Sequence, residues 1–284
     1  MIDNASSLSD KSRLVFRDTG ARHGRFISVC PANSAMKHLS YGRIRLDADT
    51  PPVSLETAGS EMALICLRGE GSIRVRDSRS NKDETHDLGM YDAIYVPRGS
   101  VVTVSTTTSV DLLECGAPVD GDYPLQIVRY ADVEKDPALK FAAGKEASSR
   151  TLNVLIGNNV RAGRLLAGFT RSAPGHWTSW PPHEHTSMLE EMYVYFDMPP
   201  PAFGLQMVYS RQDEPELVQI VREGDAVLMP SGYHPNVAVP GHPINFVWLM
   251  AAHRESQDRV FGVVNIEPAF KQGGGGSGLE AARK

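Results

Sequence analysis

The segment HWTSWPPHEHTSMLEEMYVYF, residues 176–196, decides how the chain is interpreted. At its centre His183 and His185 stand two residues apart, and Glu191 follows at the start of a strongly β-forming run. Side chains alternate between the two faces of a strand, so the two imidazoles point the same way. Imidazole and carboxylate groups are ligands of divalent transition metals. The segment therefore predicts three ligands of one metal ion.

A second segment, REGDAVLMPSGYHP at residues 222–235, offers a fourth ligand. Gly224-Asp225 is a turn-forming pair, and a short apolar strand follows it. The turn Pro230-Ser-Gly232 then presents His234. We expect His234 to complete a set of three imidazoles and one carboxylate.

Glu190 competes with Glu191 for the ligand position. Alternation along the strand places Glu191, Tyr193 and Tyr195 on one face, and Glu190 on the other face with more apolar neighbours. The more apolar face suits packing against another sheet. We therefore prefer Glu191 as the ligand.

The rest of the chain predicts an all-β protein with two similar domains. Short β-type runs separated by Gly, Pro, Asp and Asn turns occur in both halves, as is typical of sandwiches and barrels. The predicted parts are a flexible tail at 1–12, an N-terminal domain at 13–120, a connector at 121–150, a C-terminal domain at 151–270 and a flexible Gly-rich tail at 271–284.

The two halves repeat each other in sequence. YDAIYVPRGS at 91–100 matches GDAVLMPSGY at 224–233, and Glu61-Met-Ala-Leu-Ile matches Glu191-Met-Tyr-Val-Tyr. In this alignment Val101 stands where the second half has His234, and no His-x-His precedes Glu61. We expect the first half to have the same design without the metal ligands.

Composition excludes several classes of function. Of 284 residues, 41% are hydrophobic and 22% charged, which is typical of a globular protein. The net charge of -5 and the lack of a basic cluster argue against nucleic-acid binding. No segment has the apolar length of a membrane helix or the core of a signal peptide. We expect a soluble cytoplasmic protein whose three cysteines are reduced.

The two ligand segments resemble the metal-binding motifs of cupin barrels. Together with WTSWPPHEH at 177–185, LEEMYVY at 189–195 and FGLQMVY at 203–209, the second half resembles the 5-deoxy-glucuronate isomerase family of myo-inositol catabolism, a relative of the 5-keto-4-deoxyuronate isomerases. The resemblance implies two cupin (jelly-roll) barrels with one divalent metal in the C-terminal barrel, held by His183, His185, Glu191 and His234. Zn, Mn, Ni, Co and Fe all suit such ligands. It also implies a sugar acid as substrate, and we expect a homo-oligomer.

Aldose-ketose isomerisation needs a proton shuttle and a partner for the substrate carboxylate. The candidates for the acid or base are Tyr233, Tyr193, Tyr195 and Glu190, and those for substrate binding are Arg164, Arg171, Arg211 and Trp180. The sequence does not decide among them. An Fe(II) cupin dioxygenase would use the same ligands, and a non-catalytic sugar-binding cupin is a further alternative.

Overall fold

A computed structural model describes residues 13–273 and is almost entirely β-structure, which confirms the predicted class. The predicted tails lie outside the described residues, except for 271–273. The helices of the described part are short: α1 (Tyr130–Val133), η1 (Glu146–Ser148) and η2 (Pro268–Gly273). Within residues 13–273, none of them has the length and apolar character needed to cross a membrane.

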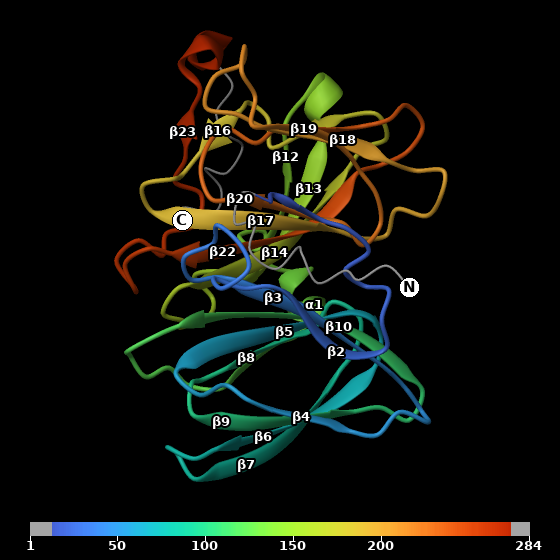
Figure 1. The fold of residues 1–284 in the computed structure, drawn as a ribbon, viewed down its shortest axis with the longest axis vertical. Helices are drawn as coiled ribbons and strands as arrows, with labels where there is room; N and C mark the ends of the chain where they lie inside the picture. The colour runs from blue at the N-terminus through green and yellow to red at the C-terminus, as the bar shows by residue number, and fades with distance from the viewer. Residues whose placement is uncertain (1–12, 274–284) are drawn as a thin grey trace, which may run out of the picture.

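The first half forms two antiparallel sheets (Figure 1). The larger has the order β11 (Gln126–Val128), β8 (Ala93–Val96), β5 (Ser60–Gly69), β10 (Ser109–Pro118), β3 (Ser40–Asp47) and β2 (Gly24–Val29). The smaller has the order β4 (Val53–Glu56), β9 (Ser100–Ser105), β6 (Gly71–Asp77) and β7 (Lys82–Leu88). One apolar cluster joins them, with Leu64 from β5 and Val75 from β6 among its buried members. Alternation on β6, where Ser72, Arg74 and Arg76 are more exposed, explains why one face is apolar.

The second half repeats this arrangement with a larger main sheet. That sheet has the order β1 (Val15–Phe16), β20 (Ala226–Met229), β17 (Leu189–Tyr195), β22 (Asn245–Ala252), β14 (Leu165–Ser172), β13 (Arg150–Ile156) and β12 (Lys140–Ala143). Facing it are β15 (Trp177–Thr178), β21 (Asn236–Ala238), β18 (Gly204–Val208) and β19 (Leu217–Val221), and the pair β16 (His183–Glu184) and β23 (Asn265–Ile266) lies apart from both.

The two large sheets pack against each other in the middle of the molecule (Figure 1). Ile65 of β5 and Met192 of β17 belong to one buried cluster that spans both halves. Strands β5 and β17 are therefore buried on both faces, which explains their continuous apolar runs. Burying one such side chain stabilises the fold by about 1.5–3 kcal/mol.

The sheets do not follow the predicted boundaries of the domains. Strand β1, at the start of the predicted N-terminal domain, pairs with β20 of the second half. The predicted connector at 121–150 contributes β11 to the first half and β12 to the second. These strands are two to four residues long, too short for a periodic pattern to be visible in the sequence.

Two buried glutamates link the halves in a reciprocal way. Glu61 of β5 accepts hydrogen bonds from the backbone N–H groups of residues 163–165, at 2.6–2.8 Å. Glu190 of β17 accepts them from residues 37–39, also at 2.6–2.8 Å. Each carboxylate thus satisfies three backbone donors of the opposite half, and hydrogen bonds to a charged acceptor are the stronger kind.

This reciprocity corrects the sequence repeat by one residue. The sequence repeat matches Glu61 with Glu191, and it also matches Val96 with Met229. In the sheets, however, Val96 pairs with Met62, and Met229 pairs with Glu191. Met62 is therefore equivalent to Glu191, and Glu61 to its neighbour at position 190. The sequence alignment is shifted because both strands contain the dipeptide Glu-Met. A shift of one residue exchanges the two faces of a strand, so the shifted alignment compares residues on opposite faces.

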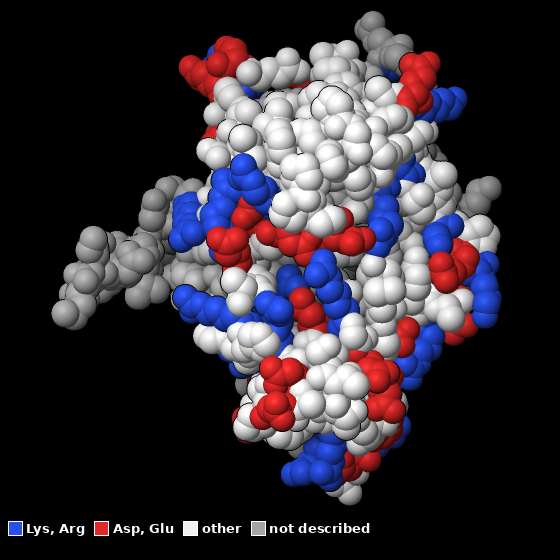
Figure 2. All heavy atoms as spheres, turned by 90° about the vertical axis from the view of Figure 1, so that its right-hand side faces the viewer, with Lys and Arg blue, Asp and Glu red and all other residues white. Residues whose placement is uncertain are grey.

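Charged side chains are mixed on the surface. On the face shown in Figure 2, basic and acidic groups are interspersed rather than gathered into a patch of one sign. Some of the ion pairs connect the halves, as between Arg68 and Glu223 at 2.7 Å. This face therefore lacks the basic stripe that nucleic-acid binding requires.

Candidate metal centre

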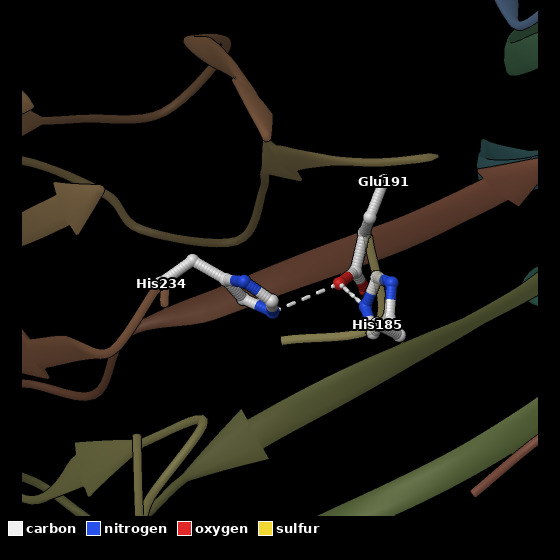
Figure 3. Close-up of side chains that lie close together, drawn as sticks. All are labelled: His185, Glu191 and His234. Carbon is white, nitrogen blue, oxygen red and sulfur yellow. Dashed lines mark hydrogen bonds and ion pairs between the residues drawn. The ribbon is translucent and has the colours of Figure 1, made fainter. Parts of the chain in front are cut away.

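Three separate segments of the second half bring three of the four predicted ligands together and place the fourth, His183, beside them. Glu191 lies on the central strand β17, His183 begins β16 with His185 just after it, and His234 follows the turn after β20. All four side chains are buried. Figure 3 shows His185 and His234 pointing toward the carboxylate of Glu191 from different elements.

The distances describe a compact cluster. Oε2 of Glu191 lies 2.8 Å from Nε2 of His185 and 3.0 Å from Nε2 of His234. Within residues 13–273, these three residues form the one group of three or more potential ligands whose atoms all lie within 4.8 Å of one another. His183 stands beside this group, with its ring centroid 5.1 Å from that of His234.

The second nitrogen of each imidazole fixes its orientation. The Nδ1 atoms lie 2.9 Å from the carbonyl oxygen of Pro181 for His183, 3.3 Å from that of Leu189 for His185, and 2.9 Å from that of Gly232 for His234. A carbonyl oxygen only accepts, so each Nδ1 carries a hydrogen and each Nε2 is the atom left to face a metal ion. Nε2 of His234 is buried, and within residues 13–273 no contact of this atom has hydrogen-bond geometry, although Oε2 of Glu191 lies 3.0 Å away. A buried lone pair facing a carboxylate fits a bound cation between them.

The electrostatics of the cluster agree with this fit. Burial by itself raises the pKa of Glu191, but His185 and His234 outweigh it and lower this pKa to about 2. Burial and the neighbouring His234 lower the pKa of His183 to about 3, so this imidazole is neutral at pH 7. Burial also acts to lower the pKa of His185, but Glu191 outweighs it and raises this pKa. A divalent cation would replace the proton that His185 otherwise shares with the carboxylate.

A cavity opens beside the ligands and includes His183 and Glu191 in its wall. Its polar lining contains Arg150, Ser179 and Tyr193. Its apolar lining consists of Leu152, Phe246, Trp248, Met250 and Phe261. A wider hollow of about 380 Å³, lined by Arg13, Arg17 and Phe26, contains none of the four ligands. The narrower cavity is therefore the candidate reaction site.

A comparison with protein families identifies the chain. The KduI/IolB family matches residues 14–263. The chain belongs to the KduI/IolB family. This confirms the resemblance drawn from the ligand segments.

Curated relatives agree with this membership. A 5-deoxy-glucuronate isomerase of Geobacillus thermodenitrificans is 28% identical over 240 residues, which cover 80% of this chain and 85% of the relative. That of Lacticaseibacillus casei is 27% identical over 239 residues, 78% of this chain and 84% of the relative.

An IolB-like protein of Salmonella typhimurium has the same fold, with a TM-score of 0.76, 22% identity and coverage of 90% and 97% of the two chains. Oxalate decarboxylase of Bacillus subtilis follows at a TM-score of 0.62, with 11% identity and coverage of 84% and 76%.

Of the predicted acid or base residues of this KduI/IolB chain, only Tyr193 lines the cavity. Its hydroxyl lies 2.7 Å from that of Ser179. Tyr195 is on the same face of β17, but its hydroxyl donates to a glutamine, Gln206, at 2.5 Å. Tyr233 packs outside the cavity against another tyrosine, with ring centroids 5.6 Å apart. The prediction for Glu190 is wrong, because its carboxylate faces the other half.

The predicted substrate-binding residues lie elsewhere. Arg164 donates to three backbone carbonyl oxygens at 2.6–2.7 Å, and Arg171 pairs with Asp197 at 2.9 Å. Arg211 is exposed and pairs with a neighbouring aspartate. The ring of Trp180 packs beside two other aromatic rings, and this residue is not part of the cavity wall. Proximity to the motifs in the sequence is therefore a poor guide to the cavity wall, because three of these four residues lie outside the strands.

Sequence reasoning missed Arg150, which was placed in the connector. It is the first residue of β13, and Leu152 and Val154 on the same face belong to the core of the second half. A charged residue on an otherwise inward-facing apolar stripe was the signal that could have found it.

Proposed function

We propose that the protein is a metal-dependent aldose-ketose isomerase that converts 5-deoxy-D-glucuronate to 5-dehydro-2-deoxy-D-gluconate in inositol catabolism. The observation that carries this proposal is the cluster of His185, Glu191 and His234, with His183 beside it, next to a cavity whose largely apolar wall includes His183 and Glu191. Membership in the KduI/IolB family and the names of the curated relatives support isomerase chemistry.

We also propose that each half is a cupin barrel and that the first binds no metal. Met62 and Val101 stand at the positions of Glu191 and His234, so the first half lacks this carboxylate and this imidazole. The fold shared with oxalate decarboxylase supports the assignment of the barrels. The cytoplasmic location and the homo-oligomer stay predictions.

The proposed mechanism assigns roles to the residues of the cavity. His183, His185, Glu191 and His234 would hold a divalent ion, of Zn, Mn, Ni, Co or Fe, whose charge would polarise the carbonyl and stabilise the enediolate. Glu191 is ionised, so it neutralises part of that charge while the imidazoles add none.

Tyr193 is the candidate hydrogen-bond donor to the substrate. Burial, together with the charge of Glu191, raises the pKa of its phenol well above 10. The phenol therefore stays protonated at neutral pH and acts as a hydrogen-bond donor to a substrate oxygen. Ser179, 2.7 Å away, orients the hydroxyl. The apolar wall around Phe246 limits the entry of water during the isomerisation.

A turnover assay tests the proposal. Metal-loaded protein is incubated with 5-deoxy-D-glucuronate and followed by NMR, beside a His183→Ala/His185→Ala variant. We expect the 2-ketose to appear with the native protein alone. Metal-loaded, folded protein without turnover would contradict the proposal, and dioxygen uptake by the ferrous form would favour a cupin dioxygenase instead.

A further inference from the structure

We propose that Arg150 binds the carboxylate of the sugar acid and thereby selects uronic acids over neutral sugars. The proposal rests on the isomerase function proposed above. Within residues 13–273, Arg150 is the single Lys or Arg in the wall of the cavity that also contains His183 and Glu191. Arg150 therefore shares one cavity wall with two of the four candidate ligands.

The backbone holds this guanidinium in place. Nη1 donates to the carbonyl oxygen of Ser148 at 3.0 Å, and Nη2 donates to that of Trp180 at 2.9 Å. Arg150 as a whole is only 5% exposed. A guanidinium carries five N–H donors in a planar fork that matches the two oxygens of a carboxylate. A side chain fixed in this way loses little entropy when it binds an anion.

The buried charge favours an anionic ligand. Burial lowers the pKa of Arg150 to about 10, so the group keeps its positive charge at neutral pH in an environment that disfavours it. A carboxylate brought in by the substrate would stabilise that charge. A neutral hydroxymethyl group at the same position would not, and this difference is the basis of the proposed selectivity.

Trp248 provides a second observation that points to a polar ligand. It lines the same cavity, and its Nε1 is buried with no hydrogen-bond partner within residues 13–273. Its ring stacks on Phe261 with centroids 5.0 Å apart. A buried indole N–H normally has an acceptor. A substrate oxygen would supply it, while the apolar side chains beside it suit the methylene group of a deoxy sugar.

Arg259 is a matched control. It is also largely buried, and it donates to the carbonyl oxygens of Leu165 and Gly157, each at 2.8 Å. Burial lowers its pKa as well. Arg259 is absent from the cavity wall, so its replacement reproduces the loss of a buried arginine bound to carbonyls without touching the proposed subsite.

The test compares two acyclic polyols that cannot isomerise. L-Gulonate carries a carboxylate where D-glucitol carries a hydroxymethyl group, and the two are otherwise identical. Dissociation constants are measured by calorimetry on metal-loaded native protein and on the Arg150→Met, Arg150→Lys and Arg259→Met variants. We expect the native protein and Arg259→Met to bind L-gulonate about a hundredfold more tightly than D-glucitol. Arg150→Met should bind both about equally, and Arg150→Lys should keep about a tenfold preference.

Three results would overturn the proposal: no preference in the native protein, a preference retained by Arg150→Met, or an equal loss of affinity for both ligands. The last result would mean that Arg150 only supports the loop around Trp180. If Arg150→Met does not fold, the Arg150→Lys variant tests the proposal: a reduced preference for L-gulonate supports it, and an unchanged preference overturns it. Turnover of 5-deoxy-D-glucuronate by the native protein is recorded separately, so failure of the isomerase proposal is distinguishable from failure of this one.

Discussion

The two halves of the molecule share an architecture but differ at the positions that could hold a metal. In both, a central strand carries a glutamate that accepts three backbone hydrogen bonds from the other half, Glu61 in the first and Glu190 in the second. The next residue differs: it is Met62 in the first half and Glu191 in the second.

This difference separates two tasks on adjacent residues. Neighbours on a strand face opposite sides. Glu61 and Glu190 therefore face the other half and join the halves, while Met62 and Glu191 face the interior of their own half. In the first half that interior is the apolar cluster around Leu64 and Val75. The second half could therefore acquire a metal site without disturbing the contact between the halves.

The largest effect on activity is expected when the ligand position of the second half is replaced by the residue of the first half. Glu191→Met should lose the bound metal and reduce turnover by about 10³-fold or more, because it removes the one anionic ligand. Metal content by elemental analysis and turnover by NMR check this.

The reverse exchange is the control. Met62→Glu should leave the metal content unchanged and lower the free energy of unfolding by about 3–4 kcal/mol, because it buries a carboxyl group in an apolar cluster. A second metal ion bound by this variant would contradict the account of the first half.

The next effect concerns the reciprocal glutamates. Glu61→Ala and Glu190→Ala should each lower the free energy of unfolding by about 3–5 kcal/mol, since each leaves three backbone N–H groups without their acceptor. Urea titration of the two variants measures this. If Glu190→Ala lost turnover at unchanged stability, Glu190 would be catalytic after all.

Removal of the metal should affect one half more than the other. A free ion at a hundred times its dissociation constant adds about 2.7 kcal/mol to stability. After chelation, hydrogen exchange should increase at residues 183–191 and around His234, while the equivalent segment around Met62 and Val101 should change little. Equal changes in both halves would argue against a site confined to the second.

The smallest effect is a pH dependence of the metal-free protein. Burial lowers the pKa of His183 from 6.5 to about 3, so between these values the unfolded chain binds a proton that the folded chain does not. Stability should therefore fall as the pH falls from 6.5 toward 3. At pH 4.5 this effect lowers the free energy of unfolding by about 2–3 kcal/mol. The variant His183→Asn should lack this part of the slope, whereas His23→Asn, at an exposed site of the first half, should keep it.

The sequence by itself determined the class of the fold and the candidate ligands. His183 and His185 share a face through local alternation, and the turn before His234 is encoded in its own residues. The preference for Glu191 over Glu190 rested on the same alternation, and the structure places Glu191 beside His185 and His234. These inferences needed only the periodicity of one strand.

Only the tertiary structure decided what covers each face. It brought Glu190 against residues 37–39, moved β1 into the sheet of the second half, and placed Arg150 in the wall of the cavity. These contacts join residues far apart in the chain. Alternation assigns a side chain to one face of a strand, but the element that packs on that face depends on the path of the whole chain.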